Sequence, residues 1–173
     1  MNSFLKMAAD RYSVRAYRPD AVEPEKIDRI LEAARLAPTA CNNQPQRIFV
    51  LQSEQARKTL AEVCPCTFGA PVIFAVGYDR TREAKNRMRP DGGGYGVTDA
   101  AIVCTHMMME ATELGLGSCW VGWFHDEQVQ DVLNLPEEVV ICDLLTVGYA
   151  AENAKPSNLH TQSRELAEMV AYL

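Results

Sequence analysis

The chain has 173 residues, of which 47% are hydrophobic and 23% are charged, a composition typical of one globular domain with a substantial core. Its formal net charge of −6 argues against a general role in binding nucleic acids or anionic membranes, because such partners require a basic surface. No apolar run is long enough for a signal peptide or a membrane span, so we expect a cytoplasmic protein with a single domain over residues 1–173.

Six cysteines are scattered along the chain without the paired spacing of a zinc or iron–sulfur site. We therefore expect no metal centre and no structural disulfide, and we interpret most of the cysteines as small buried hydrophobic residues. Cys64 and Cys66 flank a proline, which favours a turn, with a redox pair as the alternative. His106 and the run Met107–Met109 are interpreted as core residues.

The first half of the chain predicts alternating helices and strands. A short helix surrounds Phe4, and a second helix begins at Pro24, repeats apolar residues every three or four positions and ends before Pro38. A strand, a helix and a buried apolar strand are then expected at residues 47–51, 53–63 and 71–78.

The second half begins with a polar and basic stretch, residues 79–96, whose glycines predict a mobile surface loop. The longest helix should then begin at Thr98 and end at Gly115, and its many apolar residues predict burial nearly all round. The remaining expected elements are a short strand near Trp120, a small helix capped by Asp126, a strand at 139–147 and a helix near Leu166. Helices around a central sheet indicate an α+β fold.

Arg11, Ser13 and Arg15 form the first candidate site. In an extended backbone alternate side chains share a face, so these three would point the same way over roughly 13 Å. Two cations that flank a hydroxyl could follow a mononucleotide from its phosphate toward its ring. An edge strand that shows polar side chains to water is the alternative.

Two later segments also offer groups suited to a ligand. Pro38–Pro45 places short polar side chains between two prolines, and Gly115–Gly122 contains glycines that let a backbone approach a ligand closely. Each has a structural alternative, because amide side chains often bond their own loop and glycines can serve a turn alone.

These three segments, followed by Gly148-Tyr149-Ala150 and a basic tail, resemble the FMN-dependent nitroreductase family over nearly the whole chain. The resemblance implies a mostly antiparallel sheet surrounded by helices, and a homodimer with flavin sites at the subunit interface. It also implies an oxidoreductase that uses NAD(P)H to reduce nitroaromatics, quinones or related acceptors by a ping-pong mechanism. Because the chemistry is centred on the flavin, no catalytic side chain is expected.

The resemblance further implies a role for each segment. Arg11 would reach the FMN phosphate, Ser13 would bond near the phosphate and ribityl, and Arg15 would lie beside the pyrimidine edge of the ring. The loop would contact the other subunit's flavin through Pro38, Thr39, Ala40, Asn42 and Gln44. The later segment would run along the flavin through Gly117, Ser118, Trp120 and Gly122.

Two features depart from the family's pattern or match it weakly. Lys155 and Arg164 are the tail's candidates for the phosphate, but Arg164 is offset by about one position from the family's usual arginine. Gln46 stands where the family often has a tryptophan.

Other functions stay open at this point. The chain could catalyse a narrower reaction of the family, such as flavin reduction, enone reduction or dehalogenation, or it could bind flavin without turnover. A substrate or nicotinamide phosphate could meet the basic residues of the 79–96 loop, although a solvated loop is the favoured interpretation; these residues are Arg80, Arg82, Lys85, Arg87 and Arg89.

Overall fold

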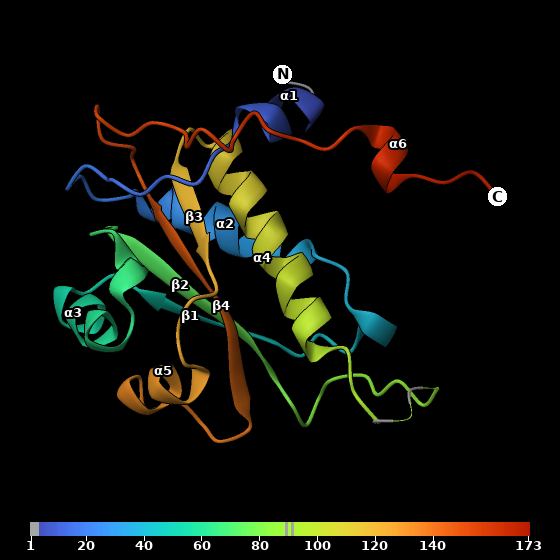
Figure 1. The fold of residues 1–173 in the computed structure, drawn as a ribbon. Helices are drawn as coiled ribbons and strands as arrows, with labels where there is room; N and C mark the ends of the chain where they lie inside the picture. The colour runs from blue at the N-terminus through green and yellow to red at the C-terminus, as the bar shows by residue number, and fades with distance from the viewer. Residues whose placement is uncertain (1–3, 89, 91) are drawn as a thin grey trace.

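The computed structural model describes residues 4–88, 90 and 92–173. A four-stranded antiparallel sheet forms the centre of the fold (Figure 1), with the spatial order β1-β2-β4-β3. The strands are β1 (Gln46–Leu51), β2 (Val72–Asp79), β3 (Gly117–Val121) and β4 (Val139–Gly148). β3 is therefore an edge strand, and one of its sides is open to another segment.

Helices cover both faces of this sheet. One face packs against α2 (Pro24–Leu36) and α4 (Gly96–Glu113), and the other against α3 (Glu54–Val63) and α5 (Asp126–Val132). The short helix α1 (Phe4–Asp10) contacts α4, and the one-turn helix α6 (Leu166–Met169) lies on the C-terminal tail. None of the helices in the described part of the chain is long and apolar enough to cross a membrane.

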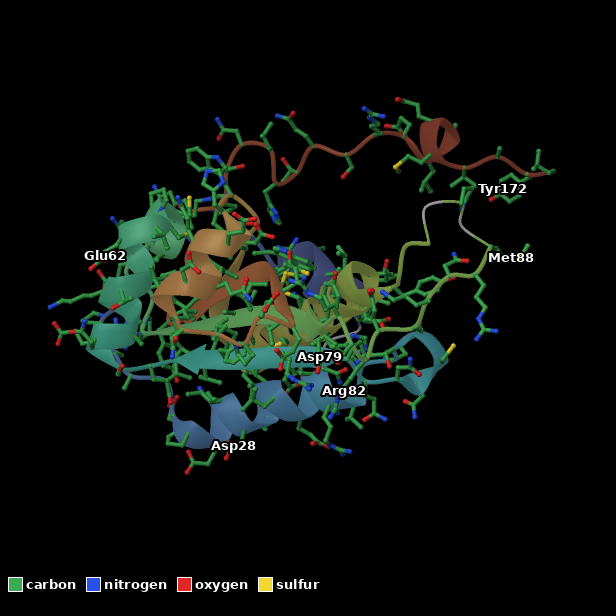
Figure 2. All side chains as sticks on the ribbon, turned by 90° about the horizontal axis from the view of Figure 1, so that it is seen from below. Asp28, Glu62, Asp79, Arg82, Met88 and Tyr172 are labelled. Atoms are coloured by element: carbon green, nitrogen blue, oxygen red, sulfur yellow. The ribbon has the colours of Figure 1, made fainter. Side chains whose placement is uncertain are left out.

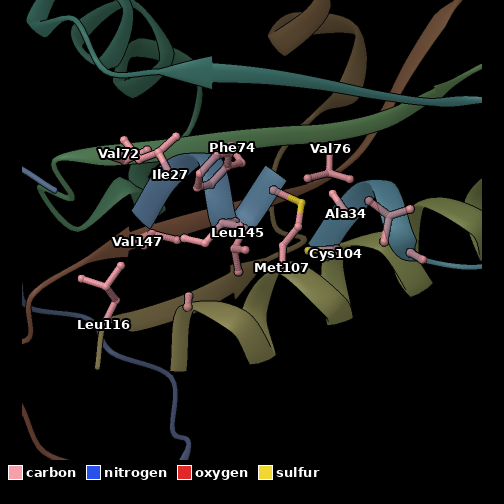
Figure 3. Close-up of a cluster of buried hydrophobic side chains, with 14 of the residues drawn as sticks. Ile27, Ala34, Val72, Phe74, Val76, Cys104, Met107, Leu116, Leu145 and Val147 are labelled. Carbon is pink, nitrogen blue, oxygen red and sulfur yellow. The ribbon is translucent and has the colours of Figure 1, made fainter. Parts of the chain in front are cut away.

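The strand β2 shows why its sequence is apolar almost without interruption. Phe74 and Val76 point into the cluster beneath α2 and α4 (Figure 3), whereas Ile73 and Ala75 point into the cluster beneath α3 and α5. Because neither face of this central strand meets water, apolar and polar residues do not alternate along it. The α+β class and the antiparallel sheet expected from the sequence are confirmed.

The longest helix differs from its prediction in two ways. α4 begins at Gly96, two residues before Thr98, and its His106 is exposed rather than part of the core. His106 lies about 200° around the helix from the buried Cys104, so the two residues face opposite ways. α4 is therefore buried on one side in this chain and not all round. Its end at Gly115, where φ is +74°, is as predicted.

The cap of α5 is also corrected. His125 occupies the N-cap position without a side-chain cap, and Asp126 is the first residue of the helix. A carboxylate there still interacts favourably with the positive end of the helix.

A bulge interrupts the pairing of the two central strands. Val76 pairs with Asp143 and Gly77 pairs with Ile141, so Cys142 has no residue opposite. The backbones come close here, because a Cβ atom on Gly77 would lie 2.0 Å from the carbonyl oxygen of Val140. The bulge depends on this glycine.

We expect Gly77→Ala to lower the free energy of unfolding by about 1–3 kcal/mol or more, since the added methyl group has no room. Gly122→Ala is the matched control, because no atom lies within 4 Å of a Cβ there, and its effect should stay within about 0.5 kcal/mol. Urea unfolding followed by circular dichroism measures both. Equal stability of the two variants would contradict a bulge that requires glycine.

Candidate functional site

The segment with Arg11, Ser13 and Arg15 lies along the open side of β3. Ser13 forms a parallel bridge with Ser118, and the backbone N–H of Val14 donates to the Ser118 carbonyl at 2.9 Å. This is one bridge rather than the longer strand that the alternation suggested. Gly117 permits the contact, because a Cβ atom there would lie 2.7 Å from Cγ2 of Val14.

The three polar residues of this segment gather around the thiol of Cys119. Burial raises the pKa of Cys119, while the charge of Arg15, a hydrogen bond with Ser13 and the charge of Arg11 act in the opposite direction. Within the described ranges, neither arginine forms an ion pair with a carboxylate. The edge of β3 therefore carries two uncompensated positive charges.

A small cavity of about 80 Å³ lies beside Arg11, between this segment, β3 and the last turn of α4. Ser118 contributes to its wall, and the Ser118 hydroxyl is buried without a hydrogen-bond partner among the described residues. Leaving a buried hydroxyl unpaired costs about 1–3 kcal/mol. A ligand that brought a phosphate or hydroxyl oxygen here could recover this cost. Asp10 also lines the cavity, but its carboxylate is paired with Lys6, so the residues fit the polar end of a mononucleotide.

Trp120 has its indole fixed inside the fold. The indole Nε1 donates to Oδ1 of Asp143 on β4 at 2.6 Å. Burial raises the pKa of Asp143, and the bond from Trp120 opposes this. The sequence analysis missed Asp143, although it is the single charged residue within the apolar strand β4.

The loop at residues 38–44 has an unusual backbone. It contains a 3₁₀ turn, η1 (Ala40–Asn42), and three of its residues other than glycine have positive φ: Cys41 (54°), Asn42 (54°) and Gln44 (50°). Such conformations cost of order 1–3 kcal/mol each and persist where the surroundings hold them. Thr39 Oγ1 accepts from the Gln44 N–H at 3.1 Å, and Asp99 Oδ1 accepts from the Ala40 N–H at 2.9 Å.

The structure does not bring this loop to the arginine segment within one chain. Asp99 lies in the first turn of α4, whereas Thr112, in its last turn, borders the cavity beside Arg11. The two residues are thirteen positions apart along the helix, a distance of about 20 Å. Pro38, Thr39, Ala40, Asn42 and Gln44 are therefore grouped together, but at the far end of α4.

The tail brings one of its two predicted cations to the arginine segment. The Tyr12 hydroxyl donates to the Ala154 carbonyl at 3.5 Å, and its ring meets that of His160 edge-on at 6.1 Å. Lys155 follows Ala154 directly and is exposed beside this contact, whereas Arg164 lies further out on an exposed stretch. Figure 2 shows Tyr172 near the free end of the tail, away from the sheet.

The loop after β2 is anchored at its base. The Asp79 carboxylate is buried, accepts from Arg47 Nη2 at 2.9 Å and from the Thr81 N–H at 2.9 Å, and lies close to Arg82 (Figure 2). Lys85 pairs with Glu83 in the same loop. Arg80 and Arg87 are exposed, and Arg89 lies outside the described residues.

The Cys64 and Cys66 thiols are free. The proline between them opens the 3₁₀ turn η2 (Pro65–Thr67), which agrees with the turn interpretation.

Comparison with known proteins identifies relatives over most of the chain. The family model described as "Nitroreductase family" matches residues 8–68 and 64–149. A crystal structure of a nitroreductase family protein from Clostridium difficile 630 superimposes with a TM-score of 0.91 and 34% identity, and covers 99% of this chain and 98% of that one.

Two further relatives have more specific names. The FMN reductase [NAD(P)H] of Bacillus subtilis is 27% identical over 170 residues, which are 89% of this chain and 68% of the relative. An FMN-dependent nitroreductase from Clostridium difficile R20291 has a TM-score of 0.77 and 24% identity, with 98% of each chain covered, and this likeness shows the fold.

Replacing Asp143 should reveal the cost of its burial. A carboxyl whose pKa is raised in the fold lowers the stability of the folded protein when it is charged. This loss of stability is complete above the pKa of the folded state and disappears below the ordinary pKa of 3.8. Asp143→Asn keeps an acceptor for Trp120 without the charge, so we expect it to be more stable than wild type at pH 7 and the difference to shrink toward pH 4.

Denaturant unfolding at both pH values measures this difference. Asp143→Ala is the control and should be destabilised at both, because it leaves the indole N–H unpaired. A constant difference between wild type and Asp143→Asn from pH 7 to pH 4 would contradict the assignment.

Proposed function

This chain belongs to the nitroreductase family, and we propose that it is an NAD(P)H-dependent oxidoreductase that carries out its chemistry on bound FMN. The names of its relatives support this cofactor and donor. The observation that carries the proposal is the segment with Arg11 and Arg15, neither of which pairs with a carboxylate among the described residues, beside the Ser118 hydroxyl, which is buried without a partner in the same part of the chain. The acceptor is a nitroaromatic, a quinone or a related electron-poor compound.

The arginine segment and β3 would hold the cofactor together. Arg11 would bind the phosphate, Ser13 would bond near the phosphate and ribityl, and Arg15 would supply positive charge at the pyrimidine edge of the ring, where reduction accumulates negative charge. The backbone from Gly117 to Gly122 would lie along the ring. Bound FMN would supply the hydride-transfer chemistry between the nicotinamide donor and the acceptor. Lys155 is better placed than Arg164 to add charge at the phosphate.

The functional unit is a homodimer with the flavin at the interface. In one chain the loop at residues 38–44 lies about 20 Å along α4 from the arginine segment, so its contact with a flavin there requires a second copy. α1, α2 and α4 border an apolar hollow of about 550 Å³ that includes Phe4, Leu36 and Met109. The tail also exposes apolar side chains that a partner could cover, among them Leu166, Met169 and Tyr172.

Donor and acceptor would use the same face of the bound ring in turn. The recognised segments all serve the flavin, and the loop after β2 shapes the substrate side. A flavin-binding protein without turnover is the competing function, and it predicts the same fold and the same phosphate contacts.

Turnover separates the two functions. Anaerobic mixing of the FMN-loaded protein with NADH or NADPH should bleach the oxidised flavin band rapidly, and steady-state assays with a quinone should give parallel double-reciprocal lines. Absence of bleaching with either donor would favour the binding protein. Intersecting lines would indicate a ternary complex and contradict the shared face.

We expect Arg11→Ala to weaken FMN binding by roughly 10- to 150-fold, because a charge-assisted bond to phosphate is worth about 1.5–3 kcal/mol. Fluorescence titration of the apoprotein measures this. Arg35→Ala, which removes an exposed arginine paired with Glu32 on α2, is the control and should bind as wild type does. Unchanged affinity of Arg11→Ala would remove Arg11 from the phosphate site.

Dilution should release flavin as the dimer dissociates. We expect FMN affinity to fall in the concentration range where analytical ultracentrifugation detects monomer, because each site needs the partner's loop at residues 38–44. A monomer that binds FMN as tightly as the dimer would contradict the shared site.

A further inference from the structure

A buried carboxylate in the first turn of α4 is the main attachment of the loop at residues 38–44. Asp99 is 1% exposed, and its Oδ1 accepts the Ala40 N–H at 2.9 Å. Ala40 is the first residue of the turn η1. The bond therefore fixes the loop at the point where its chain direction changes.

The loop's other hydrogen bonds mostly close within it. Asn42 and Asn43 donate their backbone N–H groups to the carbonyls of Thr39 and Ala40, and the Gln44 N–H reaches Thr39 Oγ1. In the described part of the chain, residues 38–44 make two hydrogen bonds to other segments: the one to Asp99, and one from Asn43 Nδ2 to the Arg82 carbonyl at 3.1 Å. The bond to Asp99 is the more buried of the two.

The backbone of this loop needs such an attachment. Cys41, Asn42 and Gln44 all have φ near +50°, a region that residues other than glycine seldom occupy. Three such residues within four positions are not the preferred shape of a free segment. An external constraint has to select this shape, and the carboxylate of Asp99 supplies it.

Asp99 is an unfavourable choice for packing alone. Its second oxygen, Oδ2, is buried without a hydrogen-bond partner among the described residues. A buried carboxyl group with an unpartnered oxygen destabilises a fold relative to an apolar residue of similar size. The contribution of Asp99 therefore lies in the hydrogen bond that its Oδ1 accepts from the Ala40 N–H.

We propose that Asp99 is a positioning residue for cofactor binding: it holds the loop at residues 38–44 in the left-handed conformation that contacts the flavin. This inference rests on the proposed function. Asp99 acts through Ala40 and touches neither cofactor nor substrate. Its removal should therefore weaken FMN binding and leave the redox chemistry of any bound flavin unchanged.

Four variants separate this role from a general structural one. Asp99→Ala removes the acceptor, and Asp99→Asn keeps an acceptor oxygen without the charge. Ala40→Pro removes the donor alone, because Ala40 does not have a positive φ, Thr39 before it is extended as a residue before proline should be, and the Ala40 N–H bonds only Asp99 among the described residues. Asp28→Ala, on the exposed side of α2 (Figure 2), is the control for loss of a carboxylate.

Hydrogen exchange on the apoprotein tests the contact without any cofactor. We expect faster exchange of the amides at residues 39–44 in Asp99→Ala and in Ala40→Pro, and near wild-type exchange in Asp99→Asn and Asp28→Ala. Unchanged exchange in a folded Asp99→Ala would overturn the proposal. If Asp99→Ala does not fold, Ala40→Pro gives the same comparison from the loop side.

FMN titration then tests the consequence. We expect about tenfold weaker binding in Asp99→Ala and in Ala40→Pro, at the lower end for loss of a bond to a charged group, and a change of less than about threefold in Asp99→Asn. The double variant that combines Asp99→Ala with Ala40→Pro should bind FMN no more weakly than either single variant, because both changes remove the same hydrogen bond. Multiplied effects, or a flavin midpoint potential that shifts in Asp99→Ala, would overturn the positioning role.

Failure of the proposed function would look different. In that case wild type itself would not bind FMN, while the exchange of the loop amides would still respond to Asp99→Ala. If wild type binds FMN and Arg11→Ala weakens binding but Asp99→Ala does not, the inference about Asp99 alone is wrong.

Discussion

The parallel contact between Ser13 and Ser118 sets the geometry of the whole arginine segment. Val14 is 2% exposed and packs where a side chain on Gly117 would otherwise stand. A slip of one residue would move Val14 out to solvent and bury a polar neighbour instead, so the register is strongly determined. The burial of one valine thereby decides that Arg11 and Arg15 lie along the edge of β3.

Much of this fold could be predicted because apolar patterning reports burial directly. β2 is continuously apolar because helices cover both of its faces, and the repeat in α2 matches the side that packs on α4. α4 misled the prediction, because its composition is apolar on faces that this chain leaves uncovered. Patterning shows which residues avoid water, and not whether the same chain or a partner covers them.

The candidate site residues were predicted unevenly for a similar reason. Arg11 and Arg15 stand out by charge and spacing, whereas Asp99 looks like any acidic residue at a helix start, which is a common and weakly informative feature. Asn42 belongs to a residue type that tolerates positive φ, but nothing in the sequence marks Cys41 or Gln44 for it. The need for glycine at position 77 becomes evident only from the structure, where the Val140 carbonyl lies too close for a side chain.

The unsatisfied polar atoms are concentrated near the candidate site. Within the described residues, three side chains have a buried oxygen without a hydrogen-bond partner: Gln46, Asp99 and Ser118. Ser118 borders the cavity beside Arg11, Asp99 bonds the loop at residues 38–44, and Gln46 is separated from that loop by Pro45 alone. Native folds contain few such atoms, and the unexplained ones are often found where a ligand or water completes the site. Asp99 and the cavity beside Ser118 thus lie at opposite ends of α4.

A two-fold axis across the exposed side of α4 would join these ends. Two copies related by such an axis, set perpendicular to the helix, would place their α4 helices antiparallel, because a two-fold rotation reverses the direction of any element perpendicular to it. The first turn of one helix, with the loop that Asp99 holds, would then lie beside the last turn of the other, with the cavity next to Arg11. The separation of about 20 Å within one chain would become proximity between chains. One apolar contact would thus complete two identical sites, each with its cations from one copy and its loop from the other.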